Sequence, residues 1–597
     1  MFQSFESLAR PEQGPPRLAA LRAAMAADGL DGFLVPRADV HQGEYVAPRD
    51  ERLAWLTGFT GSAGFCAVLD GVAGVFVDGR YSLQVREQVD LSAFTPVAWP
   101  QTQLADWLSR HLPGGGTVGF DPWLHTVKEI DALREKGARH GVTFRETDNL
   151  IDRIWQGRPA PPAGPFRVHP EALAGETHAG KRARLAADLA QAGHAAAVLT
   201  LADSLAWLFN IRGSDIRCNP LPHAFALLHE SGAAELFADA AKLTDEVRAH
   251  LGAEVALHPP AAFATRLAEL AGPVRIDPAS APVAVRAALP QPVEGRDPAV
   301  LPKARKTASE IAGMEAAHAR DAVAMCRFLA WLDREAPGGG LTEIDVVRRL
   351  EEERRRAPEL QDIAFDTICG AGPHGAMAHY RVTEETNARV VPGQLLLVDS
   401  GGQYADGTTD ITRTVATGPS TAAQRDAYTR VLRGMIAISR ARWPRGLAGR
   451  DLDALARAAL WESGRDYDHG TGHGVGAALC VHEGPQRLSR VSDVPLEPGM
   501  ILSNEPGYYR AGEWGIRIEN LVHVVAARPV EGGDDREMLA FATLTWVPID
   551  RRLIDRDGLA PWERAWLDAY HAEVARRVGP ALEGADAAWL AEATAPL

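Results

Sequence analysis

Three histidines stand close together in one glycine-rich stretch. His469, His473 and His482 lie within HGTGHGVGAALCVHEGP, residues 469–485. Imidazoles bind metal ions and transfer protons, and glycines let the backbone approach a neighbouring group closely. Taken by itself, this stretch leaves open whether the histidines are metal ligands, acid–base groups or structural residues.

Four acidic residues stand in or beside apolar, strand-like stretches. Asp399 ends QLLLVD, Asp410 opens DITRTV, and Glu505 follows GMILSN. Glu519 lies within WGIRIENLVHVV, where strand alternation places it on the same face as Arg517. A buried carboxylate is costly unless a cation or a hydrogen-bond donor compensates it. For the two aspartates, a turn-capping role stays open.

Together with a histidine of the glycine-rich stretch, these acids would form a set of hard oxygen and nitrogen ligands. Such a set suits Mn²⁺, Co²⁺ or Zn²⁺, whereas no paired cysteines indicate a structural zinc site. Four carboxylates would be balanced by two divalent ions, and such a pair activates water for hydrolysis. The pattern alone does not establish that the residues converge.

The C-terminal half combines helices with short strand-like stretches. Residues 307–336 predict a long helix with Ser309 as its N-cap, residues 342–356 a second helix, and residues 562–582 a closing helix. Hairpin-like strands lie between them. This order predicts an α+β domain with an antiparallel sheet over residues 307–597, with a C-terminal extension from about 540.

The N-terminal half contains a weak internal repeat. RLAALRAAMAADGLDGFLVPRADV with RLAWLTGFTGS (52–62) resembles KRARLAADLAQAGHAAAVLTLADSLAWLFNIRGS (181–214), and GRPAPPAGP (157–165) between them has the composition of a linker. We expect two related α/β domains over 1–158 and 159–306. A purely compositional likeness between alanine-rich helices stays open.

Composition limits the class of protein. A chain of 597 residues is too long for one core, and a formal net charge of −15 argues against a nucleic-acid partner. The sequence has neither a membrane-spanning apolar run nor a signal peptide at its start. Its five cysteines are odd in number and far apart, which fits a reducing compartment, and we therefore expect a cytoplasmic protein. They are Cys66, Cys218, Cys326, Cys369 and Cys480.

Several motifs resemble those of one family. DSGGQYADGTTDITRT, HGTGHGVG, SNEPGYY and GIRIEN are similar to the metal-site motifs of Xaa-Pro aminopeptidase (aminopeptidase P), a pita-bread metallopeptidase family. DVHQGEYVAPRDERLAWLTGFTGSAG and FVDGRYSLQV resemble the N-terminal domain of its long, three-domain cytosolic form. The likeness extends over nearly the whole chain. It implies a pita-bread catalytic domain preceded by two creatinase-like domains.

The resemblance also implies an activity and a ligand set. The family hydrolyses the bond between an N-terminal residue and a penultimate proline of a peptide, using a hydroxide that bridges two metal ions. Mn²⁺ is the expected metal, with Zn²⁺ and Co²⁺ as alternatives. The implied ligands are Asp399, Asp410, His473, Glu505 and Glu519. Asp410 and Glu519 would bridge both ions, Asp399 would hold one, and His473 and Glu505 the other.

Three residues match family positions near the scissile bond. Glu505 would shuttle the proton from water to the departing proline nitrogen. His379, in MAHYR, and His482, in VHEGP, would hydrogen-bond the substrate and the tetrahedral intermediate. Without the motif match, each histidine would be interpreted as structural.

Other matched residues would shape the substrate pocket. His469, Tyr509 and Arg517 match residues beside the proline ring. Arg80, in DGRY, and Trp461, in ALWESG, match residues on the N-terminal side of the substrate. In dimeric members the counterpart of Trp461 reaches across the interface, which implies a homodimer. Packing or surface roles for His469, Arg80 and Trp461 stay open.

Two alternatives belong to the same fold. Prolidase shares the catalytic motifs but acts on Xaa-Pro dipeptides and usually lacks the duplicated N-terminal pair. Some pita-bread domains have lost their ligands and serve as peptide-binding modules in chaperone-like proteins. That second alternative predicts broken metal motifs, whereas all five ligand positions keep the family's residue types here.

Overall fold

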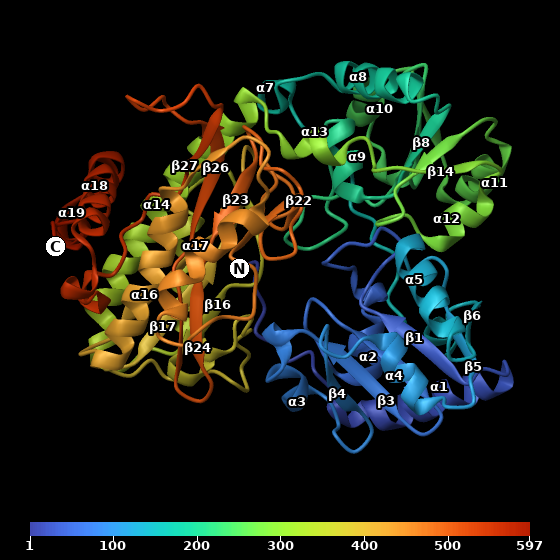
Figure 1. The fold of residues 1–597 in the computed structure, drawn as a ribbon, viewed down its shortest axis with the longest axis horizontal. Coiled ribbons are helices and arrows are strands. Elements are labelled where there is room, and N and C mark those ends of the chain that lie inside the picture. Colours follow the sequence, from blue (N-terminus) through green and yellow to red (C-terminus); the bar gives the residue numbers. More distant parts are fainter. The chain divides into compact units, whose positions relative to one another are not determined.

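The computed structural model describes all 597 residues, which form two compact units (Figure 1). One unit comprises Leu8–Lys303, and the other comprises Met1–Ser7 together with Ala304–Leu597. None of the helices combines the length and the apolar character needed to span a bilayer. The five cysteines are free thiols, as their spacing predicts.

The Leu8–Lys303 unit contains two six-stranded mixed sheets that share one topology. In each, the first strand lies fourth in the sheet, pairs antiparallel with the second, and pairs parallel with the fifth. The identical order confirms two related α/β domains. The first sheet runs β4 (Thr95–Ala98), β3 (Ala73–Val77), β2 (Phe65–Leu69), β1 (Gly32–Pro36), β5 (Gly116–Phe120), β6 (Val142–Glu146). The second runs β12 (Val255–His258), β11 (Ala234–Phe237), β10 (Phe225–His229), β8 (Ala196–Leu199), β13 (Val274–Ile276), β14 (Pro292–Glu294).

Amphipathic helices accompany these sheets. In the first copy, Leu18 and Leu21 of the leading helix are buried in one core cluster with Phe33 and Val35 of β1, because apolar residues at helical spacing form one face. The helices of this unit are α1 (Gly14–Ala27), α2 (Arg52–Thr57), α3 (Gln84–Gln88), α4 (Leu104–His111), α5 (Val127–Ala138), α6 (Leu150–Ile154), α7 (Glu171–Ala174), α8 (His178–Gln191), α9 (Ala202–Leu208), α10 (Asp245–Leu251), α11 (Phe263–Glu269) and α12 (Val283–Ala288). A strand pair, β7 (Arg167–Val168) with β9 (Ile211–Arg212), and α13 (Val300–Ala304) complete the set.

The strands of the other unit pair antiparallel throughout, as the α+β expectation requires. Its six-stranded sheet runs β20 (Arg442–Pro444), β27 (Met538–Thr543), β26 (Asn520–Ala526), β23 (Ile501–Asn504), β21 (Gly472–Gly474), β22 (Glu483–Leu488). A three-stranded sheet runs β16 (Ile368–Ala371), β17 (Leu395–Ser400), β19 (Ile411–Ala416). Two further two-stranded sheets pair β15 (Leu360–Ile363) with β18 (Gly402–Tyr404), and β24 (Gly507–Arg510) with β25 (Trp514–Arg517).

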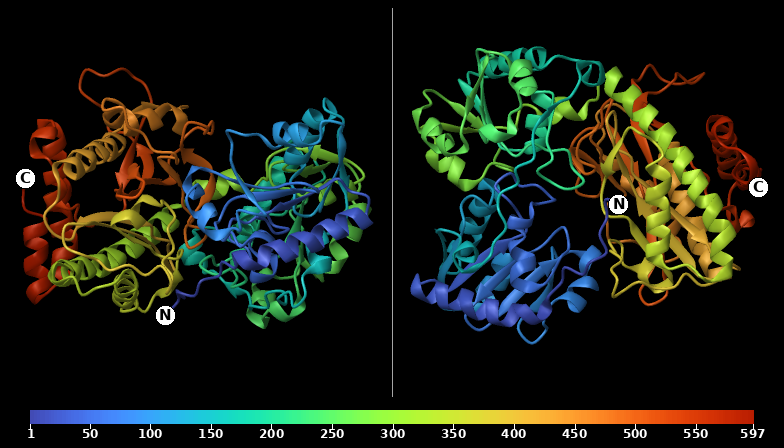
Figure 2. Two further views of the ribbon diagram at one scale, coloured as in Figure 1. Left: turned by 90° about the horizontal axis from the view of Figure 1, so that it is seen from below. Right: turned by 180° about the vertical axis from the view of Figure 1, so that it is seen from behind.

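Helices flank these sheets (Figure 2). Met314 of the longest helix packs in one cluster with Ile501 of β23 and Leu521 of β26. The helices are α14 (Ala308–Glu335), α15 (Glu343–Arg354), α16 (Ala422–Ser439), α17 (Gly449–Trp461), α18 (Pro561–Val578) and α19 (Gly584–Ala593). Because α19 follows α18, the predicted helix over 562–582 does not close the chain.

Two local expectations are wrong. The N-cap of α14 is Thr307, not Ser309, because Glu310 lies at the third helical position and completes a capping box: its backbone N–H donates to Thr307 Oγ1 at 3.1 Å, and its carboxylate accepts from Thr307 N at 2.8 Å. WGIRIENLVHVV is not one strand. It breaks at Ile518 and Glu519, since β25 pairs with β24 whereas β26 pairs with β23.

Candidate metal centre

The five predicted ligands lie in or beside strands. Asp399 is in β17 and Asp410 directly precedes β19, which is the neighbour of β17. His473 is the middle residue of β21, Glu505 follows β23, and Glu519 precedes β26. Since β21, β23 and β26 are consecutive in the six-stranded sheet, residues that are far apart in sequence are brought side by side.

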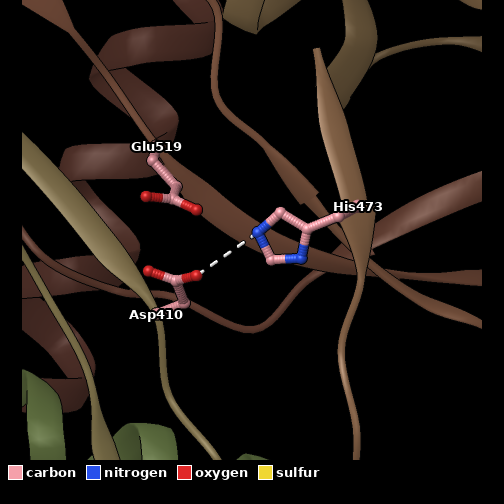
Figure 3. Close-up of side chains that lie close together, drawn as sticks. All are labelled: Asp410, His473 and Glu519. Atoms are coloured by element: carbon pink, nitrogen blue, oxygen red, sulfur yellow. Dashed lines mark ion pairs between the residues drawn. The ribbon is translucent and has the colours of Figure 1, made fainter. Parts of the chain in front are cut away.

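These side chains point toward one another. The potential ligand atoms of Asp410, His473 and Glu519 all lie within 4.8 Å of each other, and Figure 3 shows the two carboxylates facing the imidazole. His473 Nε2 is 3.5 Å from Asp410 Oδ2 and 3.4 Å from Glu505 Oε1. Burial raises the pKa of Asp410, and the nearby charges of Asp399 and Glu505 raise it further. The structure therefore gathers all five residues.

Backbone contacts orient the histidine. His473 Nδ1 lies 2.9 Å from the carbonyl oxygen of Gly474, so the donating tautomer at Nδ1 leaves the Nε2 lone pair directed at the acids. Its backbone N–H donates to Ser503 Oγ at 2.9 Å, and that hydroxyl donates to Glu505 Oε1 at 3.0 Å. A side chain at Gly472 would place Cβ 1.9 Å from the carbonyl oxygen of Ser503. The glycine thus permits the close approach of β21 to β23.

The residues fit divalent cations. Three buried carboxylate oxygens, Asp399 Oδ1, Asp410 Oδ1 and Glu519 Oε1, have no hydrogen-bond partner. Burial and the neighbouring carboxylates hold the pKa of Asp410 and of Glu519 well above the usual range. The guanidinium of Arg517, which contacts Asp399, contributes one positive charge to a cluster of four carboxylates. Two divalent ions would supply the missing charge and occupy the unpaired oxygens.

Acidification is expected to weaken metal binding. Because the pKa values of Asp410 and Glu519 are raised, the metal-free cluster takes up protons at a pH where exposed carboxylates stay ionised. Protons then compete with cations, so the apparent Kd for Mn²⁺ should rise about tenfold per pH unit for each proton displaced. Calorimetric titration between about pH 8 and about pH 6 measures this, and an affinity independent of pH would contradict it.

Arg517 links the acids to Tyr509 and, through it, to His469. Its Nε donates to Thr412 Oγ1 at 3.1 Å and its Nη1 to Tyr509 Oη at 2.7 Å, while Nη2 contacts Asp399. Tyr509 Oη lies 2.9 Å from His469 Nε2, and burial raises the pKa of Tyr509 to about 12, which keeps its hydroxyl protonated. The structure therefore joins His469, Tyr509 and Arg517 in one hydrogen-bonded chain.

His482 and His379 also lie at this site. The ring of His482 packs edge-on against that of His473, with centroids 4.2 Å apart. The carbonyl oxygen of Ala378, which precedes His379, accepts a hydrogen bond from Arg517 Nη2 at 3.2 Å. His482 thus contacts a predicted ligand, and the backbone next to His379 contacts Arg517.

Arg80 and Trp461 have other surroundings. Arg80 belongs to the Leu8–Lys303 unit, where its Nε and Nη2 donate to the carboxylate of Asp78 at 2.9 and 2.7 Å. Trp461 ends α17 with 45% of its surface exposed, hydrogen-bonds Asp466 and lies against Arg490. None of these contacts joins either residue to the five predicted ligands.

The sequence did not indicate the roles of Arg457 and Asp453, which hydrogen-bond the glycine-rich stretch and the residues just before it. Arg457, on α17, donates to the carbonyl oxygens of Tyr467 and His469 at 2.7 Å each and pairs with Asp453 at 2.7 Å. Asp453 also accepts from Thr471 Oγ1 at 2.6 Å. The local signal was only an acidic and a basic residue four positions apart on a helix, which is common on solvated surfaces.

Comparison with known sequence families agrees along the chain. Residues 312–526 match metallopeptidase family M24, and residues 537–597 match the C-terminal region of peptidase M24. Residues 17–154 and 157–310 each match a creatinase/prolidase N-terminal domain.

Individual relatives are similar over most of their length. Aminopeptidase P2 of Arabidopsis thaliana is 40% identical, with 95% of this chain and 86% of the relative covered. A probable Xaa-Pro aminopeptidase P of Aspergillus fumigatus is 38% identical, with 97% and 92% covered. The crystal structure of an X-prolyl aminopeptidase from Caenorhabditis elegans, described as a cytosolic enzyme with a di-nuclear active site, superposes with a TM-score of 0.93 at 33% identity, covering 98% of this chain and 100% of that one.

Proposed function

Since the chain belongs to the aminopeptidase P family of M24 metallopeptidases, we propose that it removes the N-terminal residue from peptides whose second residue is proline. The observation that carries this proposal is the convergence of Asp410, His473 and Glu519 within 4.8 Å, with Asp399 and Glu505 beside them. Four acids and one imidazole around unpaired buried oxygens are a site for hydrolysis assisted by two metal ions.

We assign the metal ligands as Asp399, Asp410, His473, Glu505 and Glu519. When bound, two divalent ions would supply Lewis acidity and an activated water molecule. The donors are mostly carboxylate oxygens with a single imidazole, which favours Mn²⁺ over metals that prefer nitrogen and sulfur. Metal analysis of the purified protein distinguishes Mn²⁺ from Zn²⁺ and Co²⁺.

The chain's own residues would then handle protons and charge. The Glu505 carboxylate, held by the Ser503 hydroxyl at 3.0 Å, is placed to accept a proton from water and to protonate the departing proline nitrogen. His482 and His379 would donate hydrogen bonds to the substrate carbonyl as negative charge develops on its oxygen. Cleavage of a bond to proline needs a specialised site, because the proline residue has no backbone N–H and its φ is fixed.

His469, Tyr509 and Arg517 would form the wall against the proline ring. Their hydrogen bonds of 2.9 and 2.7 Å make that wall rigid and connect it to Asp399. Arg80 and Trp461 would contact the N-terminal side of the substrate.

Peptide length distinguishes this activity from that of prolidase. A tripeptide Xaa-Pro-Xaa is expected to be cleaved at least as efficiently as the dipeptide Xaa-Pro, because no free C-terminal carboxylate beside the proline is required. An otherwise identical Xaa-Ala-Xaa peptide is the control and should be a poor substrate. Release of the first residue, measured by chromatography, tests this. Cleavage confined to the dipeptide would indicate a prolidase.

We further propose a three-domain organisation over residues 1–158, 159–306 and 307–597, with the C-terminal extension from about 540. This division is supported by the two equivalent sheets and the family matches. We also propose a cytoplasmic homodimer. Free cysteines support that compartment, and the exposed Trp461 is a candidate contact between subunits. Light scattering measures the oligomeric state.

A further inference from the structure

The first seven residues belong to the compact unit that carries the metal centre, and both views of Figure 2 place the N-terminus beside that unit. Residues 1–7 contain no helix or strand and contact α15. The carboxylate of Glu351, on α15, accepts from the backbone N–H groups of Phe2 and Gln3 at 2.7 and 3.3 Å. The guanidinium of Arg348 covers the ring of Phe5, which is only 6% exposed. One edge of this segment is thus fixed to a helix.

Side-chain and backbone contacts continue beyond α15. The Gln3 amide binds the backbone of Thr367 in both directions: its oxygen accepts from Thr367 N at 2.9 Å, and its nitrogen donates to Thr367 O at 3.4 Å. Thr367 directly precedes β16. The segment is therefore also fixed beside the three-stranded sheet.

The other edge of the segment holds the loop that carries His379. Arg381 donates from Nη2 to the carbonyl oxygen of Ser4 at 2.8 Å and from Nη1 to that of Glu6 at 2.9 Å. The N–H of Glu384 donates to the carbonyl oxygen of Phe5 at 2.8 Å. Three consecutive carbonyl groups of the N-terminal segment thus bind residues two to five positions after His379.

This loop has no secondary structure of its own to fix it. Residues 378–389 contain no helix or strand, so the position of His379 depends on individual contacts. Before His379, the carbonyl oxygen of Ala378 accepts from Arg517. After it, the Tyr380 hydroxyl bonds the buried carboxylate of Glu343 at 3.1 Å, and Arg381 Nε bonds Asp366 at 2.9 Å.

We propose that residues 1–7 form a strap that positions His379 for catalysis. The strap fixes Arg381 and Glu384 relative to α15, and so holds the loop after His379 while Arg517 holds the loop before it. This inference rests on the role proposed above for His379. It makes Phe5 and Arg381 positioning residues, which act through His379 and touch neither the metal ligands nor the substrate.

Removing residues 2–7, or replacing Phe5→Ala or Arg381→Lys, is expected to lower kcat about tenfold or more, because small displacements of a catalytic group are costly. KM should change less than about twofold and metal content should stay the same, since the strap contacts no proposed ligand. The matched controls are Glu6→Ala and Arg389→Lys, whose exposed side chains lie in the same two segments. Both controls should retain wild-type kcat.

Two measurements separate positioning from general destabilisation. In a His379→Ala background the strap substitutions should cause no further loss, because they act through that residue. Equal losses with and without His379 would overturn the strap. Independently of activity, hydrogen exchange should accelerate in the amides of residues 378–388 and stay unchanged in β17. Unchanged exchange of that loop in the deletion variant would also overturn it. A wrong proposal for His379 would show differently, as a His379→Ala variant with wild-type kcat.

Discussion

Replacing Asp410 by asparagine is expected to lower kcat on an Xaa-Pro tripeptide by at least about 10³-fold, equivalent to about 4 kcal/mol of transition-state stabilisation. The substitution removes a buried carboxylate that lies 3.5 Å from His473 Nε2 and has one unpaired oxygen. Metal content should fall with activity. The control is Asp493→Asn, which removes one charge from an exposed position and should leave both unchanged.

The same substitution should stabilise the metal-free protein. Burial raises the pKa of both Asp410 and Glu519; in addition, the charge of Asp410 raises the pKa of Glu519, and the charges of Asp399 and Glu505 raise that of Asp410. Removing one of them relieves repulsion, so Tm without metal should rise by roughly 2–4 °C for each kcal/mol of repulsion removed. With saturating Mn²⁺ the order should reverse, since wild type binds the ions and Asp410→Asn binds them weakly. A metal-free variant less stable than wild type would contradict this account of the cluster.

Chelation is expected to abolish turnover, and added Mn²⁺ is expected to restore it. Without cations the four carboxylates remain, with the Arg517 guanidinium at Asp399, and no residue of the cluster can by itself activate water as two metal ions do. Activity assayed after dialysis against EDTA, then after titration with Mn²⁺, measures this effect. Full activity in protein shown to be metal-free would refute a metal-dependent mechanism.

Chelation should also destabilise the protein more at high pH than at low pH. The raised pKa values of Asp410 and Glu519 mean that the metal-free fold binds protons which the unfolded chain releases. Their contribution to stability is therefore present at acidic pH and is lost as pH rises through the raised pKa values. Metal binding strengthens over that same range. The fall in Tm caused by EDTA should thus be larger at about pH 8 than at about pH 6, whereas a larger fall at acidic pH would contradict the assignment.

Most of the metal centre could be predicted because its residues have local signatures. Asp399, Asp410 and Glu505 stand at the ends of apolar strands. His473 lies among glycines, which allow its strand to approach the neighbouring strand closely. Glu519 lies beside the other predicted ligands, but the local reason given for it is wrong. It occupies a break between two strands rather than the middle of one, because each flanking strand pairs with a different partner. That choice of partners is a tertiary property.

Contacts between distant segments had no such signature. No local pattern predicts that the Arg517 guanidinium contacts Thr412, Tyr509, Asp399 and the carbonyl oxygen of Ala378. In the sequence, Arg457 is the basic member of an ordinary acidic–basic pair on a helix. The fold brings its guanidinium to the backbone carbonyl oxygen of His469. The environment of Arg517 does not follow from neighbouring residues, since one of its partners lies 139 positions away.

The sequence by itself determined the donor types, their order along the chain, the duplicated α/β domains and the antiparallel catalytic domain. These properties depend on residue chemistry and on hydrophobic periodicity, both of which are local. Only the tertiary structure decided that residues 1–7 join the catalytic unit and contact the loop of His379, more than 370 positions away. A segment without regular secondary structure or apolar periodicity carries no local signal that fixes its partner. Its backbone groups bind those groups elsewhere in the chain that helix packing and strand pairing have left unpaired.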